Sequence, residues 1–318
     1  MQKLSATVVI PTYNYAQFLG DAISSALDQG DAVSRIIVID DGSTDSTPEL
    51  IRQYPSVCYV RQANAGLATS RNNGLQLVET EYVVFLDSDD RLSQGSVARN
   101  IRAIQNTGFK AVSGTYELID EVGRPMRAPV SENNLLKSFS GQTLRYGYSD
   151  LLKENLIGVP CSVLYVTEEI RRLGGFNSAY NPCEDLFLYF QLARENKLGF
   201  HPDLVAEYRK HGNSMSDNTK GMHKGVVKVY GEQRPFISSD ETLKLAHDEG
   251  IDQWNTMYGP RMVAKCVNYA RSLKLPEAMA ELQYILGYSP KLFMVSGLEL
   301  FRRQFRKISS RVKGVLAP

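Results

Sequence analysis

The chain has 318 residues, of which 43% are hydrophobic and 22% charged, with a formal net charge of +1. This composition is ordinary for a globular protein, and the length suffices for one large domain with an appendage. A nearly neutral chain has no overall attraction to nucleic acid, so we expect no nucleic-acid partner.

Cysteine spacing and the lengths of the apolar runs exclude two further classes. The four cysteines form no CxxC pair, which argues against a zinc cluster and fits a reducing compartment. No apolar run reaches the ~18–20 residues that a membrane-spanning helix needs, and the start of the chain lacks a secretory signal pattern. The sequence therefore predicts a cytoplasmic protein.

Short apolar strands alternate with amphipathic helices over the first 90 residues. Strands are expected at 7–10, 35–39, 57–61 and 82–86, and helices at 18–27, from about 46, and at 67–78. Such alternation predicts parallel strands joined by right-handed crossovers. The expected fold class is α/β, with a single open, mostly parallel, Rossmann-like sheet flanked by helices.

Beyond residue 90 the periodicity is weaker. Helices are expected at 96–107, 167–173 and 184–195, strands at 111–119, 159–166 and 204–208, and a loop at 121–147. After about residue 220 the pattern is helical, with a hairpin of 253–273 and 276–286 and one or two more helices in 290–315. We therefore expect one domain at 1–219, with its two halves at 1–95 and 96–219. A helical C-terminal appendage follows at 220–318.

Polar or acidic residues follow each of the first four strands, where open α/β sheets bind their ligands. No strand is followed by GxGxxG or by GxxxxGK[ST], which argues against a dinucleotide fold or a P-loop. The fourth strand ends in Asp87, Ser88, Asp89 and Asp90, and in extended chain Asp87 and Asp89 face the same way. Two carboxylates on one face predict a divalent cation such as Mg²⁺ or Mn²⁺, which would carry a nucleotide diphosphate. The simpler alternative is an Asp-rich turn.

The order and spacing of these clusters resemble the family 2 glycosyltransferases. The matching segments are VVIPTYN at 8–14, IDDGSTD at 39–45, NAG at 64–66 with RN at 71–72, FLDSDD at 85–90, LGGFN at 173–177, CED at 183–185 and YRKHGNSMS at 208–216. The resemblance covers roughly residues 5–216. It implies a GT-A-like fold, with a nucleotide-binding half at 1–95 and an acceptor half at 96–219. It also implies Mn²⁺ or Mg²⁺ as cofactor and inverting transfer of a sugar from a nucleotide-diphospho-sugar.

The resemblance also implies roles for individual residues. Thr12 and Tyr13 would flank the nucleotide base, which Asp41 would hydrogen-bond, and Asp185 would be the general base. The donor-binding residues implied are Pro11, Thr12, Tyr13, Asp41, Asn64, Gly66, Arg71, Asp87, Ser88 and Arg209. The implied metal ligands are Asp89, Asp87 and His211, although Asp87 could instead face the ribose and His211 the leaving diphosphate.

Three of these assignments have structural alternatives. Asp185 could simply favour the start of a helix through the helix dipole. Arg71 could pair with a nearby acid such as Asp41 and be architectural. His211 could be an exposed loop histidine without a function.

The expected function is transfer of a sugar, most simply a UDP-linked one, to a glycan or lipid-linked acceptor in surface polysaccharide synthesis. The alternatives are a non-catalytic nucleotide-sugar-binding module and a sugar-nucleotide nucleotidyltransferase. The latter would need a basic Gly-rich loop after the first strand, which residues 11–14 do not supply. Residues 298–315 could form a basic amphipathic helix, which would either lie on the inner face of the membrane or pack onto the domain.

Overall fold

The computed structural model describes residues 4–126, 143–212 and 214–288. The chain forms two compact units, Met1–Ser214 and Met215–Pro318. Every residue of the expected site lies in the first unit. The domain limits expected at 219 and 220 stay a prediction.

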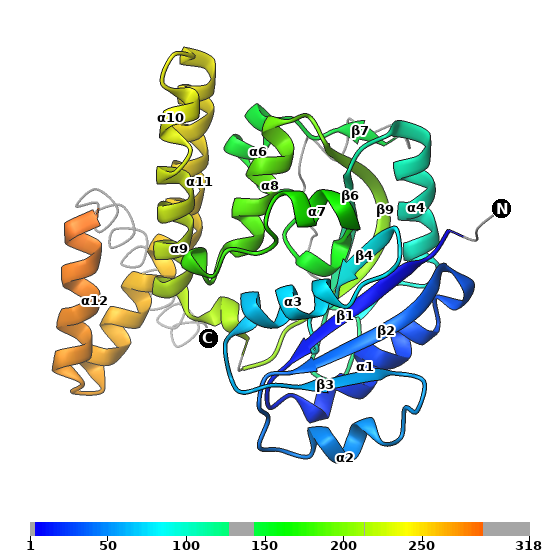
Figure 1. Ribbon diagram of the computed structural model, residues 1–318. Helices are drawn as coiled ribbons and strands as arrows, with labels where there is room; N and C mark the ends of the chain where they lie inside the picture. Colours follow the sequence, from blue (N-terminus) through cyan, green and yellow to red (C-terminus); the bar gives the residue numbers. More distant parts are fainter. Residues whose placement is uncertain (1–3, 127–142, 213, 289–318) are drawn as a thin grey trace, which may run out of the picture. The chain divides into compact units, whose positions relative to one another are not determined.

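The first unit is built on one nine-stranded sheet with the order β3-β2-β1-β4-β8-β6-β9-β5, and β7 pairs with β9 (Figure 1). The strands are β1 (Ala6–Thr12), β2 (Val33–Asp40), β3 (Cys58–Arg61), β4 (Tyr82–Phe85), β5 (Arg91–Leu92), β6 (Ala111–Ile119), β7 (Leu144–Arg145), β8 (Val163–Val166) and β9 (Leu198–Arg209). The apolar runs of β1 and β4 are buried along their whole length, as expected of central strands covered on both faces.

The sheet is mixed, which corrects the expectation of a mostly parallel one. Strands β1, β2, β3 and β4 are parallel, as the strand and helix alternation of the first 90 residues predicts. That alternation ends after β4, and β8 enters between β4 and β6 antiparallel to both. Strand β9 then runs parallel to β6 and antiparallel to β5 and β7. The α/β fold class itself is confirmed.

Helices flank the sheet of the first unit (Figure 1). They are α1 (Ala16–Leu27), α2 (Thr47–Ile51), α3 (Leu67–Gln76), α4 (Ser96–Thr107), α6 (Tyr148–Lys153), α7 (Thr167–Arg172) and α8 (Glu184–Arg194), with short 3₁₀ turns at Gly30–Ala32, Pro160–Ser162 and Ser178–Tyr180. Helix α3 packs closely on β1, because a side chain at Gly74 would overlap Val9. This close contact brings Arg71, one turn earlier on α3, toward the edge of the sheet.

Three differences from the predicted elements have local causes. The strand expected at 159–166 begins only at Val163, because Pro160, which has no backbone N–H, opens a 3₁₀ turn. Strand β9 begins six residues before the expected 204, through a stretch with little apolar alternation. The short elements β5, β7 and α6 were not predicted, and β7 lies in the segment that we expected to be a loop.

The second unit is helical in its described part, as predicted. Its helices are α9 (Thr219–Gly231), α10 (Arg234–Ile237), α11 (Glu241–Arg271) and α12 (Leu275–Tyr288), after a 3₁₀ turn at Met215–Asp217. Helices α11 and α12 form the predicted hairpin, and α9 packs on α11. Buried His223 joins the three, with Nδ1 2.7 Å from Tyr284 Oη and Nε2 3.0 Å from Asn255 Oδ1. The expected basic helix at 298–315 lies outside the described residues.

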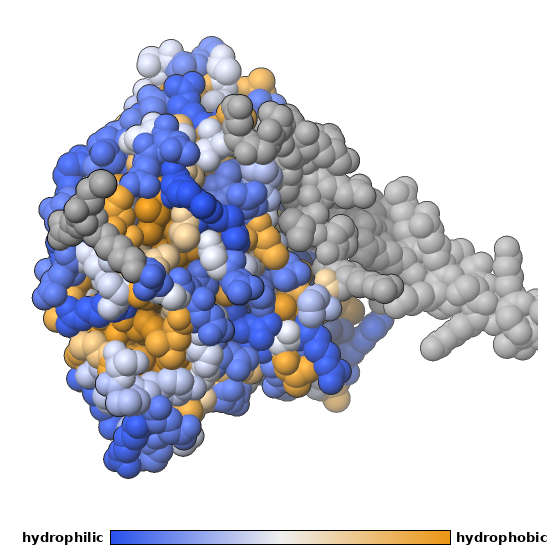
Figure 2. Space-filling view, turned by 90° about the vertical axis from the view of Figure 1, so that its right-hand side faces the viewer, coloured by the Kyte–Doolittle hydropathy of each residue, from blue (hydrophilic) through white to orange (hydrophobic). Residues whose placement is uncertain are grey.

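Two observations bear on membranes and surfaces. Within the described part of the chain, no helix combines the length and apolar character needed to cross a bilayer. On the face seen in Figure 2, apolar side chains gather in patches that hydrophilic surface separates.

Candidate active site

The carboxyl ends of β1 to β4 bring the predicted polar clusters to one edge of the sheet. Thr12, the last residue of β1, pairs with Asp40 at the end of β2, and the next N–H along, that of Asp41, donates to the Thr12 carbonyl at 2.9 Å. The Leu86 N–H, just past β4, donates to the Val9 carbonyl at 2.9 Å. The residues after these strands are therefore neighbours in space.

Asp41 organises the loop that leads into α3. Its Oδ1 accepts hydrogen bonds from the Ala65 N–H and from Gln62 Nε2, at 2.8 and 2.7 Å. Its Oδ2 accepts the Gly66 N–H at 2.8 Å. Gly66 has a φ of 89°, a conformation that suits glycine. This buried carboxylate is thus already surrounded by donors from its own chain.

Other predicted donor-binding residues, which follow or end strands β1 and β3, differ in exposure. Thr12 is buried, and its hydroxyl has no hydrogen-bond partner among the described residues. Tyr13 is 45% exposed, so its ring is available for stacking on a ligand. Asn64 is also exposed, whereas Pro11 is buried within β1.

Arg71 is a buried bridge between two carboxylates that lie far apart in the sequence. Its Nη2 donates to Asp87 Oδ1 at 2.6 Å and its Nη1 to Glu184 Oε1 at 2.9 Å. Burial alone would lower the pKa of Arg71, but the charges of Asp87 and Glu184 outweigh it and raise that pKa. The alternative, a pair with a nearby acid such as Asp41, gives the right kind of partner, but the acids that Arg71 contacts are Asp87 and Glu184. The bridge ties the end of β4 to the first turn of α8.

Asp89 and His211 form a second pair at the same edge. His211 Nε2 lies 3.0 Å from Asp89 Oδ2, and the His211 side chain is only 2% exposed. The imidazole packs against the rings of Tyr15 and Phe18, with centroid distances of 5.6 and 4.8 Å. His211 is therefore not an exposed loop histidine. Burial and then the charge of Asp87 raise the pKa of Asp89.

Asp90 points into the protein rather than toward a ligand. Its Oδ1 accepts the Arg209 N–H at 2.9 Å, and the Cys161 thiol lies 3.5 Å from its Oδ2. Burial and then the charges of Asp89 and Asp87 raise the pKa of Asp90. Ser88 lies between Asp87 and Asp89, whose side chains are partly exposed, and is itself buried.

Asp185 lies in the first turn of α8, next to the buried Glu184. Burial and then the Glu184 carboxylate raise the pKa of Asp185 to about 7, while Arg71 acts in the opposite direction. Asp185 Oδ1 accepts the N–H of Leu186 at 2.8 Å, so the residue also interacts with the start of its helix. A carboxyl group that titrates near neutral pH suits a general base.

Carboxyl groups are crowded around the residues that follow β4 and the first turn of α8. The pKa values of Asp89, Asp90 and Asp185 are all raised, because burial and like charges disfavour their ionised forms. Within the described ranges, no group of three or more His, Cys, Asp or Glu residues is arranged to hold a metal ion. Asp89 and His211 are in direct contact, whereas Asp87 is bound by Arg71.

Sequence reasoning missed two charged residues that contact the predicted site. Glu184 adjoins Asp185, so its position in the CED segment was a signal, but its partner Arg71 is 113 residues away. Asp21 binds Arg209 from the exposed side of α1, and no motif marks it. Asn72, noted only as part of a motif, clamps the backbone of Phe176 at both its N–H and its carbonyl.

The chain is similar to known glycosyltransferases in sequence. Residues 7–158 match the family model described as Glycosyl transferase family 2. TuaG of Bacillus subtilis, a glycosyltransferase whose name proposes a role in teichuronic acid biosynthesis, is 28% identical over 237 residues. That alignment covers 72% of this chain and 88% of TuaG.

Two solved structures share the fold. The mannosyltransferase PcManGT from Pyrobaculum calidifontis, in complex with GDP-Man and Mn²⁺, matches with a TM-score of 0.58 at 18% identity, over 99% of this chain and 88% of PcManGT. TarS 1-349 of S. aureus, in complex with UDP-GlcNAc, matches with a TM-score of 0.52 at 15% identity, over 89% of this chain and 92% of TarS 1-349. At these identities the likeness shows the fold alone.

Proposed function

We propose, from the match of residues 7–158 to the model of glycosyl transferase family 2 and the similarity to TuaG, that the chain is a member of this family and transfers a sugar from a nucleotide-diphospho-sugar with inversion at the anomeric carbon. The donor is UDP-linked in this proposal. TarS, which shares the fold, was solved with UDP-GlcNAc, and PcManGT with GDP-Man. The acceptor is a hydroxyl of a glycan or a lipid-linked glycan.

The nucleotide base would bind between Tyr13 and the loop that Asp41 organises. Tyr13 offers an exposed ring for stacking, and the buried Thr12 hydroxyl, unpartnered among the described residues, offers a hydrogen bond. Asp41 already accepts two backbone N–H groups of this loop. We therefore assign it first to shaping the pocket, with its remaining lone pairs available to the base. In this proposal Asn64 and Gly66 belong to the same wall, and Arg71 would lie behind it, bound to Asp87 and Glu184.

A divalent cation fits the pair formed by Asp89 and His211. A carboxylate oxygen and an imidazole nitrogen 3.0 Å apart suit Mn²⁺. Burial and then the charge of Asp87 raise the pKa of Asp89, and a bound cation would favour its ionised form. Such ions commonly use one or two carboxylates and complete their shell with substrate phosphates and water, so a preformed site of three ligands is not required. When bound, the ion would neutralise charge on the departing diphosphate.

Asp185 would act as the general base. Its carboxylate would take the proton of the acceptor hydroxyl as that oxygen bonds to the anomeric carbon and the bond to the nucleoside diphosphate breaks. With a pKa of about 7, the group is partly ionised at neutral pH and can receive a proton. Arg71, held by Asp87 and Glu184, would keep Asp185 near the donor side of the site.

The biological setting would be the synthesis of a surface polysaccharide, on the cytoplasmic side of the membrane. The support is the name of TuaG, which connects that relative to an envelope polymer. Residues 298–315 would provide peripheral membrane attachment through their basic, amphipathic pattern. Flotation with anionic liposomes, comparing the full chain with one that ends at 297, tests this part, and equal binding by both would overturn it.

The observation that carries the proposal is the Arg71 bridge, which joins the acidic end of β4 to the helix that bears Asp185. A thermal-shift screen of UDP-, GDP- and dTDP-sugars, each with and without Mn²⁺, tests it, because a bound ligand raises the melting temperature by mass action. We expect a shift for one nucleotide that grows with Mn²⁺. No shift with any of these donors would contradict the proposal.

A further inference from the structure

Arg209 is a buried hub at the end of β9, with every guanidinium nitrogen bonded inside the protein. Its side chain is 1% exposed. Nε donates to the Asp89 carbonyl at 2.8 Å, Nη1 to the Glu121 carbonyl at 2.9 Å, and Nη2 to Asp21 Oδ2 at 2.7 Å. The resemblance implied a donor-binding role for Arg209, but every nitrogen of this buried guanidinium already donates to a protein group.

The hub holds both members of the pair that suits a metal ion. The Nε bond fixes the backbone of Asp89, and the backbone N–H of Arg209 fixes the side chain of Asp90 at 2.9 Å. The guanidinium also lies over the ring of Phe18, 5.0 Å from its centroid, and that ring packs against His211. Displacement of Arg209 would therefore move Asp89 and His211 relative to each other.

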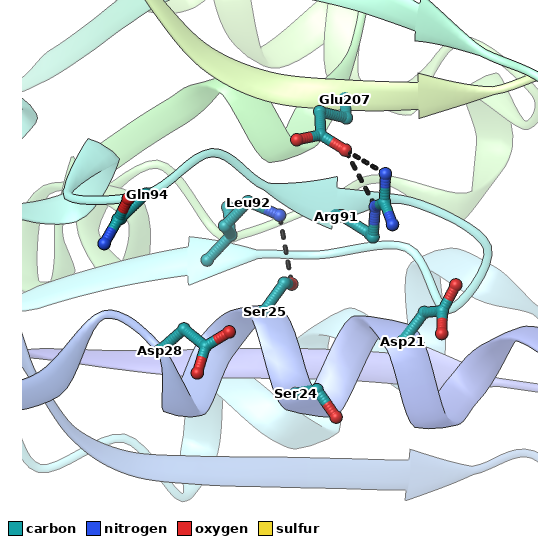
Figure 3. A pocket seen from close by; sticks show the side chains of 8 residues that line it. All are labelled: Asp21, Ser24, Ser25, Asp28, Arg91, Leu92, Gln94 and Glu207. Atoms are coloured by element: carbon teal, nitrogen blue, oxygen red, sulfur yellow. Dashed lines mark hydrogen bonds and ion pairs between the residues drawn. The ribbon is translucent and has the colours of Figure 1, made fainter. Parts of the chain in front are cut away.

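Asp21 is the carboxylate that pairs with Arg209 within the described part of the chain. It lies on α1, with a side chain 50% exposed, in the wall of an open pocket of about 580 Å³ (Figure 3). A buried guanidinium is costly without a carboxylate partner. Without the Asp21 charge, Arg209 would be drawn toward the other acids of its surroundings, Asp89 and Asp90.

We propose that Asp21 and Arg209 are a positioning pair that holds Asp89 and His211 in place for the metal-bound diphosphate, and that Arg209 does not itself touch the donor. This inference rests on the proposed function, because it needs a metal and a nucleotide at Asp89. It assigns a role to Asp21 that neither the sequence motifs nor its exposed position on α1 indicate.

The chain offers a closely matched control for Asp21. Asp28, the residue directly after α1, lies seven residues further along the chain, lines the same pocket, and is not among the groups that bind Arg209 (Figure 3). Asp21→Asn and Asp28→Asn therefore remove the same charge from the wall of the same pocket, and only the first removes the partner of Arg209. Asp21→Glu keeps the charge and serves as the conservative variant.

The test is calorimetric titration of Mn²⁺ into the full-length protein with UDP present, and with GDP in a parallel series, alongside the melting temperature of each variant. We expect Asp21→Asn to bind Mn²⁺ about 10–100-fold more weakly, as is typical when a residue that orients a metal ligand is lost. Asp28→Asn should bind like the wild type, and Asp21→Glu should recover most of the affinity.

Two results would overturn the positioning role. A lower melting temperature with unchanged Mn²⁺ affinity would make the pair merely structural. Unchanged or tighter nucleotide binding by Asp21→Asn would instead favour Arg209 as a direct phosphate ligand, because that variant releases Nη2. A separate outcome concerns the proposed function itself. That function fails if the wild type does not bind Mn²⁺ in the presence of UDP or of GDP.

Discussion

The two halves of the candidate site are built on opposite principles. At the end of β2, the Asp41 carboxylate is buried among N–H donors of its own chain, and the loop around it is complete without a ligand. At the end of β4, the carboxyl groups of Asp89 and Asp90 have raised pKa values because they are buried beside one another. The first half is a preformed pocket wall, and the second stores electrostatic repulsion that a cation would relieve.

The largest expected effect is on catalysis, in Asp185→Asn. The substitution removes the group that accepts a proton but keeps its size, so we expect transfer to fall by about 10²–10⁴-fold with donor binding retained. Initial rates of donor consumption with a cell-envelope acceptor fraction measure the loss, and calorimetry measures donor affinity. Glu184→Gln, at the adjacent position, should retain most of the transfer activity at pH 8. Near-normal turnover in Asp185→Asn would show that another residue is the general base.

The comparison between the two halves predicts opposite changes in the stability of the metal-free protein. Asp41→Asn should destabilise by about 1–3 kcal/mol, because at least one buried N–H of the 64–66 loop loses its acceptor. Asp89→Asn should stabilise at neutral pH, because it removes a charge that the fold disfavours. Chemical denaturation of both variants without metal tests this. Destabilisation of the same size in both variants would mean that the two carboxylates contribute alike to the stability of the metal-free protein.

The smallest effect concerns pH, through Asp185. Its folded pKa of about 7 lies above the unfolded value near 3.8, so the folded state holds the extra proton between these limits. The metal-free protein should therefore gain stability as the pH is lowered from above 7 toward 5, and kcat/KM should fall over the same range. In Glu184→Gln the acid limb should move to lower pH, because the Glu184 charge raises the pKa of Asp185. If the acid limb of the pH profile stays at the same pH in Glu184→Gln, the charge of Glu184 does not affect the pKa of the general base.

The parallel half of the fold could be predicted from the sequence because its signals are local. Apolar runs mark β1 to β4, and each ends in polar residues that lie at one edge of the sheet. Strand β5 has only two residues, and β9 passes through His201, Pro202 and Asp203, so neither shows a period that a sequence pattern could reveal. The antiparallel entry of β8 depends on tertiary packing alone.

The same distinction applies to the site. The strand-end acids carry their own signal, because each directly follows an apolar strand. The partners of the charged site residues carry no such signal in the sequence. Arg71 binds Glu184, 113 residues away, and Arg209 binds Asp21, 188 residues away. No spacing rule links residues so far apart, so the sequence named Arg71 and Arg209 as ligands when their described contacts are with protein acids and carbonyls.

The most direct test of the central claim is the affinity for UDP with and without Mn²⁺, in the wild type and in Asp89→Asn. If the crowded carboxyl groups after β4 bind a cation that in turn holds the diphosphate, Mn²⁺ should tighten UDP binding by about 5–150-fold in the wild type, the usual range for coupled ligands. That gain should vanish in Asp89→Asn. Equal UDP affinity with and without Mn²⁺ in the wild type would contradict the account.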